Sequence, residues 1–109
     1  MLTEDEKVKI FKALGNGTRL AILMNMLRKP YVCSVNEGSE LMDILGQAAC
    51  VGSIAREFNF TAPTISRHLK ELREAGLIIM YKEGNRIFVV PNNDVIREIV
   101  EFTSGLIPR

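Results

Sequence analysis

The sequence contains two cysteines, Cys33 and Cys50, and one histidine, His68, which are the residues that could form a catalytic Cys–His pair or a thiolate–imidazole metal site. A catalytic Cys–His pair needs a base beside an activated thiol, and no nucleophile motif surrounds either cysteine. A zinc-type site needs several His or Cys ligands, so metal binding is the least favoured role for His68. The sequence therefore predicts that the protein is not an enzyme and contains no cofactor-binding motif, while soft-metal binding or oxidation at the cysteines stays open.

The two cysteines leave three interpretations open. A Cys33–Cys50 disulfide requires their Cα atoms to come within about 7 Å. An arsenite-type trigonal site needs three thiolates, so a second chain would have to supply one of them. Both residues are otherwise small buried hydrophobes, since free cysteine is among the most buried residue types. Thiol oxidation and soft-metal binding thus remain hypotheses for a sensing role.

A predicted helix that begins at Thr61 carries a different chemistry, the binding of phosphates and bases. Thr61-Ala-Pro-Thr64 is typical of an N-cap followed by proline in the first helical turn. An apolar stripe follows at helical spacing, formed by Ile65, Leu69 and Leu72. The opposite, solvent side carries Ser66, Arg67, Lys70 and Arg73. His68 is at the edge of the stripe, where one interpretation is a half-buried histidine whose ring nitrogens are satisfied by hydrogen bonds. Arginine pairs with guanine in the major groove, and hydroxyls bind phosphates or bases less selectively.

Two β-rich stretches follow this helix, over residues 77–81 and 87–90. They are joined by Lys82-Glu-Gly-Asn-Arg86, in which Gly84-Asn85 is a hairpin turn signal. A short helix over 53–58, a tight link, a helix with a basic face and a basic-tipped hairpin are typical of a helix-turn-helix motif with a wing. We therefore expect Lys82, Asn85 and Arg86 to contact DNA.

The remaining elements complete a mainly α winged helix-turn-helix fold of about five or six helices and a two-stranded β-hairpin. Thr3 and Glu6 form a capping-box signature for a helix through Leu14. Further helices are predicted from an N-cap at Thr18 through residue 28, over 39–45, and after the cap candidates Asn92-Asn93-Asp94. The whole chain, residues 1–109, is expected to be a single domain.

Composition limits the class of protein. A chain of 109 residues with 47% apolar residues has enough material for one core. It contains no apolar run that could cross a bilayer, its first residues are acidic, and it has two cysteines, so we expect a cytoplasmic protein. The net charge is only +1, yet residues 61–86 carry five Lys or Arg against three Asp or Glu. Any electrostatic footprint for phosphate therefore lies in that segment.

With these motifs in place, the sequence resembles the ArsR/SmtB family of winged-helix transcriptional regulators. Residues 13–23 are similar to the family's opening segment, residues 61–77 to its recognition helix with a Ser-x-His-Leu core, and residues 82–86 to its wing. The resemblance implies a dimer in which the first and last helices pair across a twofold axis. It also implies DNA contacts from Thr61, Thr64, Ser66, Arg67, His68, Lys70, Arg73, Lys82, Asn85 and Arg86.

The sequence departs from the family pattern in two places. The stretch 30–50 is longer than the family's usual connection, so it is an insert. Metal sensors of the family often carry Cys-x-Cys before the recognition helix, where this chain has Cys50-Val-Gly52. The last helix contains Asp94, Glu98 and Glu101 but no His, so the family's zinc site cannot form there.

Two functions follow as hypotheses. The first is a repressor that binds a pseudo-palindromic operator on double-stranded DNA as a homodimer and is released by an inducer or a thiol-directed signal. The alternative is a winged-helix module that docks on protein or RNA without promoter-specific DNA binding. Salt-dependent binding to duplex DNA distinguishes the two.

Overall fold

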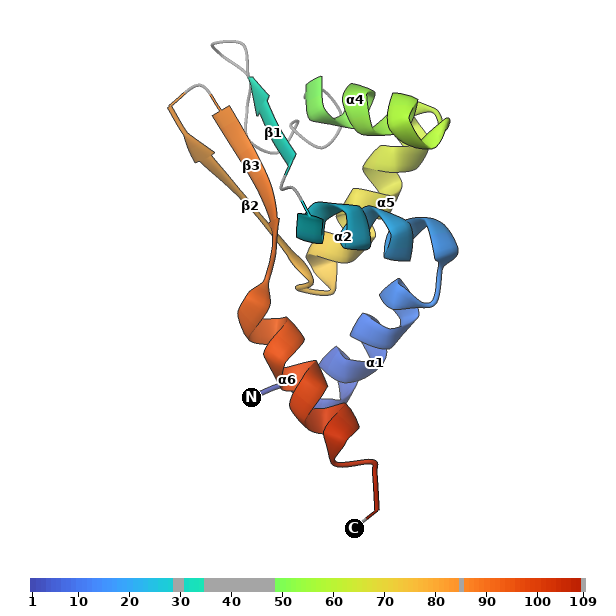
Figure 1. The fold of residues 1–109 in the computed structure, drawn as a ribbon, viewed down its shortest axis with the longest axis vertical. Coiled ribbons are helices and arrows are strands. Elements are labelled where there is room, and N and C mark those ends of the chain that lie inside the picture. Colours follow the sequence, from blue (N-terminus) through green and yellow to red (C-terminus); the bar gives the residue numbers. More distant parts are fainter. Residues whose placement is uncertain (29–30, 35–48, 85, 109) are drawn as a thin grey trace.

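The computed structural model describes residues 1–28, 31–34, 49–84 and 86–108, which form helices and a small antiparallel sheet. The elements in chain order are α1 (Glu4–Leu14), α2 (Gly17–Arg28), β1 (Tyr31–Ser34), α4 (Ala49–Phe58), α5 (Ala62–Glu74), β2 (Ile78–Glu83), β3 (Arg86–Pro91) and α6 (Asn93–Ser104). Helices α2, α4 and α5 lie on one side of the sheet (Figure 1). Within these described residues, no helix has the length and apolar character needed to span a membrane. The mainly α winged helix-turn-helix class is confirmed.

Side-chain caps set the starts of the helices. The predicted capping box of α1 is present, and Thr61 and Asn92 cap α5 and α6 as predicted. The prediction that Thr18 caps α2 is wrong, because the helix already begins at Gly17. Asn16 takes this role instead, and its Oδ1 accepts a hydrogen bond from the backbone N–H of Arg19 at 3.0 Å. An Asn amide reaches the N–H three residues on as well as a Thr hydroxyl does.

The core lies where α1, α2, α4 and α5 meet the inner face of the sheet. Its fully buried side chains are Ile10, Ile22, Met26, Ile54, Ile65, Leu69, Leu72, Leu77 and Val89. Three of these are the predicted apolar stripe of α5. Because a fully buried side chain of this size contributes about 1.5–3 kcal/mol, the stripe fixes the rotation of α5 about its own axis.

The predicted hairpin is present and is extended by a third strand. The strand order is β1-β3-β2, antiparallel throughout, with Tyr81 opposite Phe88 and Tyr31 opposite Val89. Sequence analysis missed β1, a four-residue strand whose partner lies more than fifty residues away along the chain. Gly76, with φ +80°, ends α5 in the left-handed conformation expected there, and Gly84, with φ +62°, lies in the hairpin turn.

Two predicted helices in and beside the insert have different outcomes. The helix expected over 53–58 begins earlier, at Ala49. The helix expected over 39–45 lies outside the described residues. In Figure 1, α4, β1 and the hairpin tip occupy one end of the molecule, whereas α1, α6 and both chain termini occupy the opposite end. Helix α4 and the hairpin tip therefore lie far from α6, whereas α1 also packs against α5.

Candidate nucleic-acid interface

Helix α5 presents a polar face to solvent directly opposite its buried stripe. Arg67 and Lys70 are exposed, while Ser66 and Arg73 are half-buried. The four residues predicted to face solvent thus share one side of the helix, and α4 packs beside it. A helix of 13 residues that displays hydroxyl and guanidinium groups along one side has the shape and chemistry of a major-groove reader.

The first turn of α5 adds two hydroxyls to this face. The Oγ1 of Thr61 accepts a hydrogen bond from the backbone N–H of Thr64 at 3.4 Å, and the two hydroxyl oxygens are 2.9 Å apart. Thr61 is exposed and Thr64 is half-buried. These groups lie at the positive end of the helix dipole, where phosphate oxygens are favoured.

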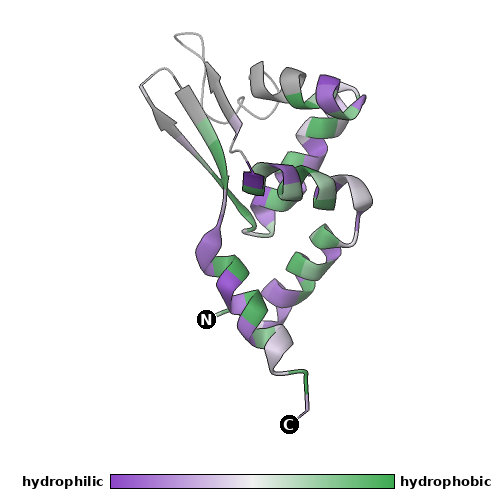
Figure 2. Ribbon diagram, viewed as in Figure 1, coloured by the Kyte–Doolittle hydropathy of each residue, from purple (hydrophilic) through white to green (hydrophobic). Residues whose placement is uncertain are grey.

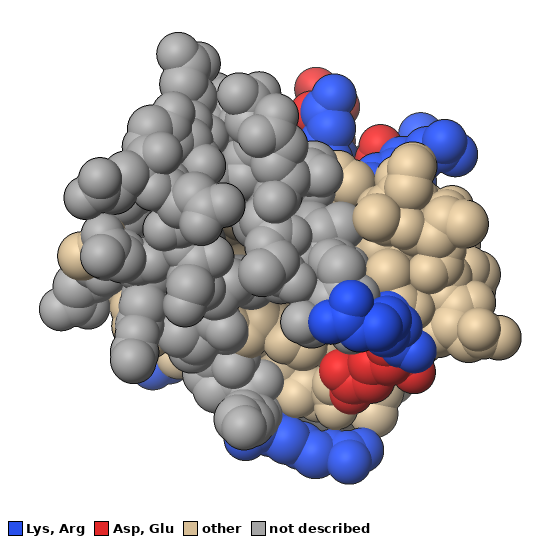
Figure 3. Space-filling view, turned by 90° about the horizontal axis from the view of Figure 1, so that it is seen from above, with Lys and Arg blue, Asp and Glu red and all other residues tan. Residues whose placement is uncertain are grey.

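Acidic side chains moderate the charge of this region. Lys70 Nζ lies 4.0 Å from Glu74 Oε1, one turn further along the same helix. An exposed pair of this kind contributes about 0.3–0.5 kcal/mol, so it does not prevent Lys70 from binding another anion. Where residues are described on the face shown in Figure 3, basic groups stand apart from one another and several have acidic atoms beside them.

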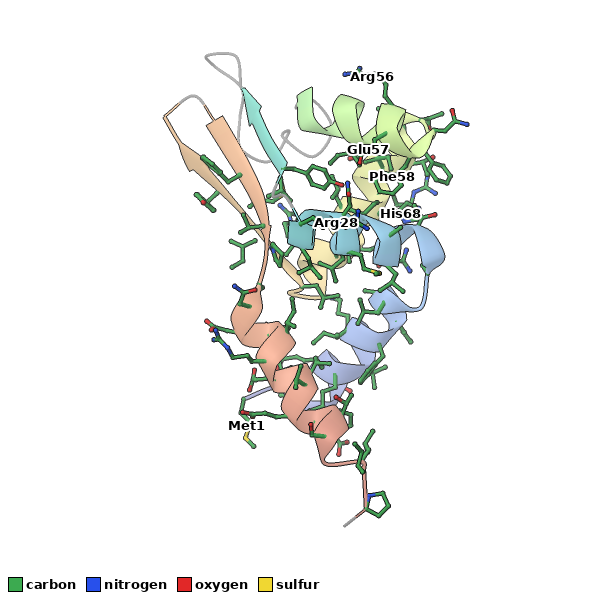
Figure 4. The ribbon with its side chains drawn as sticks, viewed as in Figure 1. Met1, Arg28, Arg56, Glu57, Phe58 and His68 are labelled. Carbon is green, nitrogen blue, oxygen red and sulfur yellow. The ribbon has the colours of Figure 1, made fainter. Side chains whose placement is uncertain are left out.

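His68 is half-buried beside the polar face of α5, where its ring contacts side chains from outside the helix. Its Nδ1 lies 3.3 Å from a terminal guanidinium nitrogen of Arg19, and its ring meets that of Phe60 edge-on, with the ring centroids 6.5 Å apart. His68 is labelled in Figure 4. Burial lowers the pKa of His68 below 6.5, the charges of Arg19 and Arg67 lower it further, and Glu71 opposes the shift. Of its three proposed roles, this geometry matches a satisfied, half-buried histidine.

The wing residues are placed by their strands. Lys82 is on β2 and Arg86 is on β3, on either side of the turn. In the strand register, the backbone of Glu83 lies opposite that of Arg86. Asn85 and the side chains of Lys82 and Arg86 lie outside the described part of the structure. Sequence analysis missed the stacked rings of Tyr81 and Phe88, whose centroids are 5.0 Å apart. Their opposite positions in the predicted hairpin were the available signal, since cross-strand aromatic pairs stabilise a two-stranded wing.

The cysteines fall on two separate elements. Cys33 is in β1, opposite Ile87 of β3, and Cys50 is in the first turn of α4. Their side chains lie outside the described part of the structure, so the thiol hypotheses stay predictions. Among the side chains that are described, no three His, Cys, Asp or Glu residues gather into a potential metal site.

A polar contact that sequence analysis missed joins β1 to the helix-turn-helix. The side-chain amide of Asn25 in α2 donates to Glu57 Oε1 of α4 at 2.6 Å and to the Tyr31 hydroxyl of β1 at 3.0 Å. Burial raises the pKa of Tyr31, the hydrogen bond from Asn25 opposes this shift, and the charge of Glu57 adds to it. Tyr31 is therefore a neutral phenol at pH 7, and the first strand of the insert region is attached directly to α2.

Helices α1 and α6 form the other notable surface. Both carry apolar residues along much of their length (Figure 2), and the rings of Phe11 and Phe102 lie 6.0 Å apart. None of the α6 residues, all of which are described, is fully buried. Val8 is 51% exposed, Phe11 41% and Val100 57%. Apolar side chains left this open on adjacent helices are typical of a surface that a second subunit covers.

Comparisons with known proteins give one consistent result. Residues 39–79, which include α4 and α5, match the model of the bacterial regulatory protein, arsR family. An uncharacterized HTH-type transcriptional regulator of Methanocaldococcus jannaschii is 32% identical over 102 residues, which is 94% of this chain and 96% of the relative. The transcriptional repressor SdpR of Bacillus subtilis is 30% identical over 90% of this chain and 89% of its own.

Solved structures agree with this result. The homodimeric winged helix-turn-helix DNA-binding domain of a possible ArsR-family regulator from Mycobacterium bovis has a TM-score of 0.61 and 25% identity, covering 93% of this chain and 80% of that one. An ArsR-like transcriptional regulator from Rhodococcus has a TM-score of 0.68 at 20% identity, covering 94% and 79%. At 20% identity, the similarity to the Rhodococcus protein shows a shared fold alone.

Proposed function

Since this chain belongs to the ArsR family of helix-turn-helix transcriptional regulators, we propose that it is a repressor that binds duplex DNA as a homodimer, with α5 of each protomer in a major groove. The observation that carries the proposal is the solvent-facing side of α5, where Arg67 and Lys70 are exposed opposite a buried stripe. The relatives are transcription regulators and not enzymes, which agrees with the predicted absence of catalytic chemistry.

We assign distinct roles to the two basic elements. Arg67 and Ser66, near the middle of α5, read base edges, whereas Lys70, Arg73, Thr61 and Thr64 bind phosphates along the same face. Lys82, Asn85 and Arg86 at the wing bind the backbone of the flanking duplex. Contacts to base edges carry sequence preference, and contacts to phosphates carry affinity that falls with salt. His68 supports α5 from within instead of contacting DNA.

The homodimer forms through α1 and α6. These two helices carry the exposed residues Val8, Phe11 and Val100 at the end of the molecule away from the hairpin tip. The Mycobacterium bovis domain to which this chain is similar is homodimeric, which supports the formation of a dimer. A twofold dimer carries two copies of α5, so it matches an operator with twofold symmetry.

The proposal is tested by DNase footprinting and by titration of the isolated operator at several salt concentrations. We expect two protected half-sites whose centres are about 10 bp apart, or a multiple of that, and an affinity that falls steeply with salt. Protection of one asymmetric half-site at saturating protein would contradict the dimer. Salt-insensitive or absent binding to every duplex would contradict the DNA-binding function and favour the docking module.

Release of the operator by a thiol-directed signal is a further part of this proposal. Cys50 lies in the first turn of α4, the helix that packs on α5, and Cys33 lies in β1 next to the wing strand β3. A bond formed at either thiol would act on an element that contacts the DNA-reading surface.

A further inference from the structure

One guanidinium joins three helices in this protein. Arg19, half-buried in the first turn of α2, donates from Nε to the carbonyl oxygen of Ala13 at 2.7 Å and from a terminal nitrogen to that of Lys12 at 3.3 Å. Both carbonyls are in the last turn of α1. Its other terminal nitrogen lies 3.3 Å from Nδ1 of His68 in α5. Arg19 therefore binds the end of α1 and the middle of α5 at once.

The contacts at α1 are favourable for a reason that does not involve α5. Carbonyls in the last turn of a helix have no partners within the helix, and the helix dipole places partial negative charge there. A guanidinium satisfies two of these acceptors with nitrogens held in one plane. The position of the Arg19 side chain is thus defined by α1, and it presents its remaining nitrogen to His68 from a fixed direction.

The contact at His68 requires a neutral imidazole. Nδ1 accepts the hydrogen bond from Arg19 only when it carries no proton, which leaves the single ring proton on Nε2. The charged groups that act on this ring are Arg19 from α2, and Arg67 and Glu71 from α5 itself, while Phe60 covers its edge. Burial and the two cations favour the neutral ring, so the link is intact at pH 7.

We propose that Arg19 is a positioning residue that holds the recognition helix α5 at a fixed angle to α1 and thereby sets the half-site spacing that the dimer reads. The inference rests on the proposed function, in which α1 pairs across the twofold axis and α5 enters the groove. A rigid link between these helices fixes the distance between the two copies of α5. Without it, each α5 retains its base contacts but can rotate relative to the dimer axis.

The link is tested first without DNA. His68 is the only histidine in the chain, so its NMR signals are unambiguous. We expect Nδ1 to be unprotonated and the His68 pKa to lie below 6.5 in the wild type. In Arg19→Ala the pKa should rise and the preference for one tautomer should weaken. Arg97→Ala is the matched control, because it removes an exposed guanidinium on α6 and should change neither quantity. An unchanged His68 pKa and tautomer in Arg19→Ala would overturn the link.

The effect of Arg19 on the half-site spacing that the dimer prefers is tested with operators whose half-sites are moved apart or together by about 1 bp. One base pair rotates a half-site by about one tenth of a turn, so a rigid dimer should bind the altered operators at least about tenfold more weakly. In Arg19→Ala we expect this preference to fall to about threefold or less. His68→Leu, which keeps the Arg19 contacts to α1 and removes only the acceptor, should behave in the same way, whereas Arg97→Ala should retain the wild-type preference.

Three outcomes separate the possible roles. A full spacing preference in both Arg19→Ala and His68→Leu overturns the positioning role. The positioning role is also overturned if both variants bind every operator with equally reduced affinity and the affinity of His68→Leu depends less on salt. That result would identify His68 as a direct phosphate contact. A wild-type protein that binds no duplex refutes the proposed function, and the NMR titration then still decides whether Arg19 holds α5. Lowering the pH through the His68 pKa should reduce the spacing preference of the wild type but not of His68→Leu.

Discussion

Val100→Glu tests whether the α1–α6 surface is the dimer interface. Val100 is 57% exposed in the single chain. Full burial of a valine side chain contributes about 1.5–3 kcal/mol, so covering the exposed part contributes about 0.9–1.7 kcal/mol per copy and about 1.7–3.4 kcal/mol per twofold dimer. The dimer dissociation constant should therefore rise by about 20- to 300-fold. Burial of an unpaired carboxylate adds to this value, which makes it a lower bound.

Analytical ultracentrifugation over a range of concentrations measures the dimer dissociation constant directly. Arg97→Glu is the control, because Arg97 lies one turn away on α6 and its side chain is 75% exposed in an ion pair with Asp94. An exposed pair of this kind contributes little to stability. The control changes the charge by two units and Val100→Glu by one, so a purely electrostatic effect would be larger in the control. A dimer as tight in Val100→Glu as in the wild type would refute the proposed interface.

The remaining predictions concern the DNA contacts, the core and the thiols. Arg67→Ala should weaken cognate binding by about 1–3 kcal/mol and relax base discrimination while leaving the thermal midpoint unchanged, and an unaltered sequence preference by anisotropy titration would remove its base-reading role. Arg86→Ala should weaken all duplexes alike and reduce the salt slope by about one unit; if it changed only sequence preference, the roles of wing and helix would be reversed. Leu69→Ala, at a site 1% exposed, should cost about 2–5 kcal/mol of unfolding free energy in urea, and a smaller loss would mean that the stripe does not anchor α5. Operator binding by the wild type should respond to mild peroxide, arsenite or cadmium in a way that Cys50→Ser does not, and identical binding under all conditions would show that the cysteines only pack.

The pH dependence of stability follows from His68. Its pKa is lowered on folding, so between the folded value and 6.5 the unfolded chain binds more protons than the native chain. The contribution of the neutral ring is fully present above about pH 6.5 and is lost as the pH falls through the folded pKa. Urea unfolding of the wild type and of His68→Leu at pH 7.5 and 5.5 measures this contribution. If His68→Leu lost more unfolding free energy between pH 7.5 and 5.5 than the wild type, the stabilising role of the neutral His68 ring would be contradicted.

Features that depend on neighbouring residues were predictable from the sequence. The Thr61 cap, the spacing of Ile65, Leu69 and Leu72 and the left-handed Gly76 all act within one helix, so periodicity and capping chemistry were sufficient. The hairpin followed from β-forming residues on both sides of a turn signal. The exposed side of α5 was therefore identified with its basic residues before any tertiary contact was known.

Contacts between distant segments were decided only by the tertiary structure. β1 forms because β3 has an open edge, and nothing within its own four residues indicates a partner. The sequence placed His68 at the edge of a stripe, but only the packing of α2 against α5 brings the Arg19 guanidinium to its Nδ1. The Asn25–Glu57 contact likewise joins residues 32 positions apart. Side-chain pairs of this kind have no periodic signature in the sequence, because packing of the core determines which distant residues come into contact.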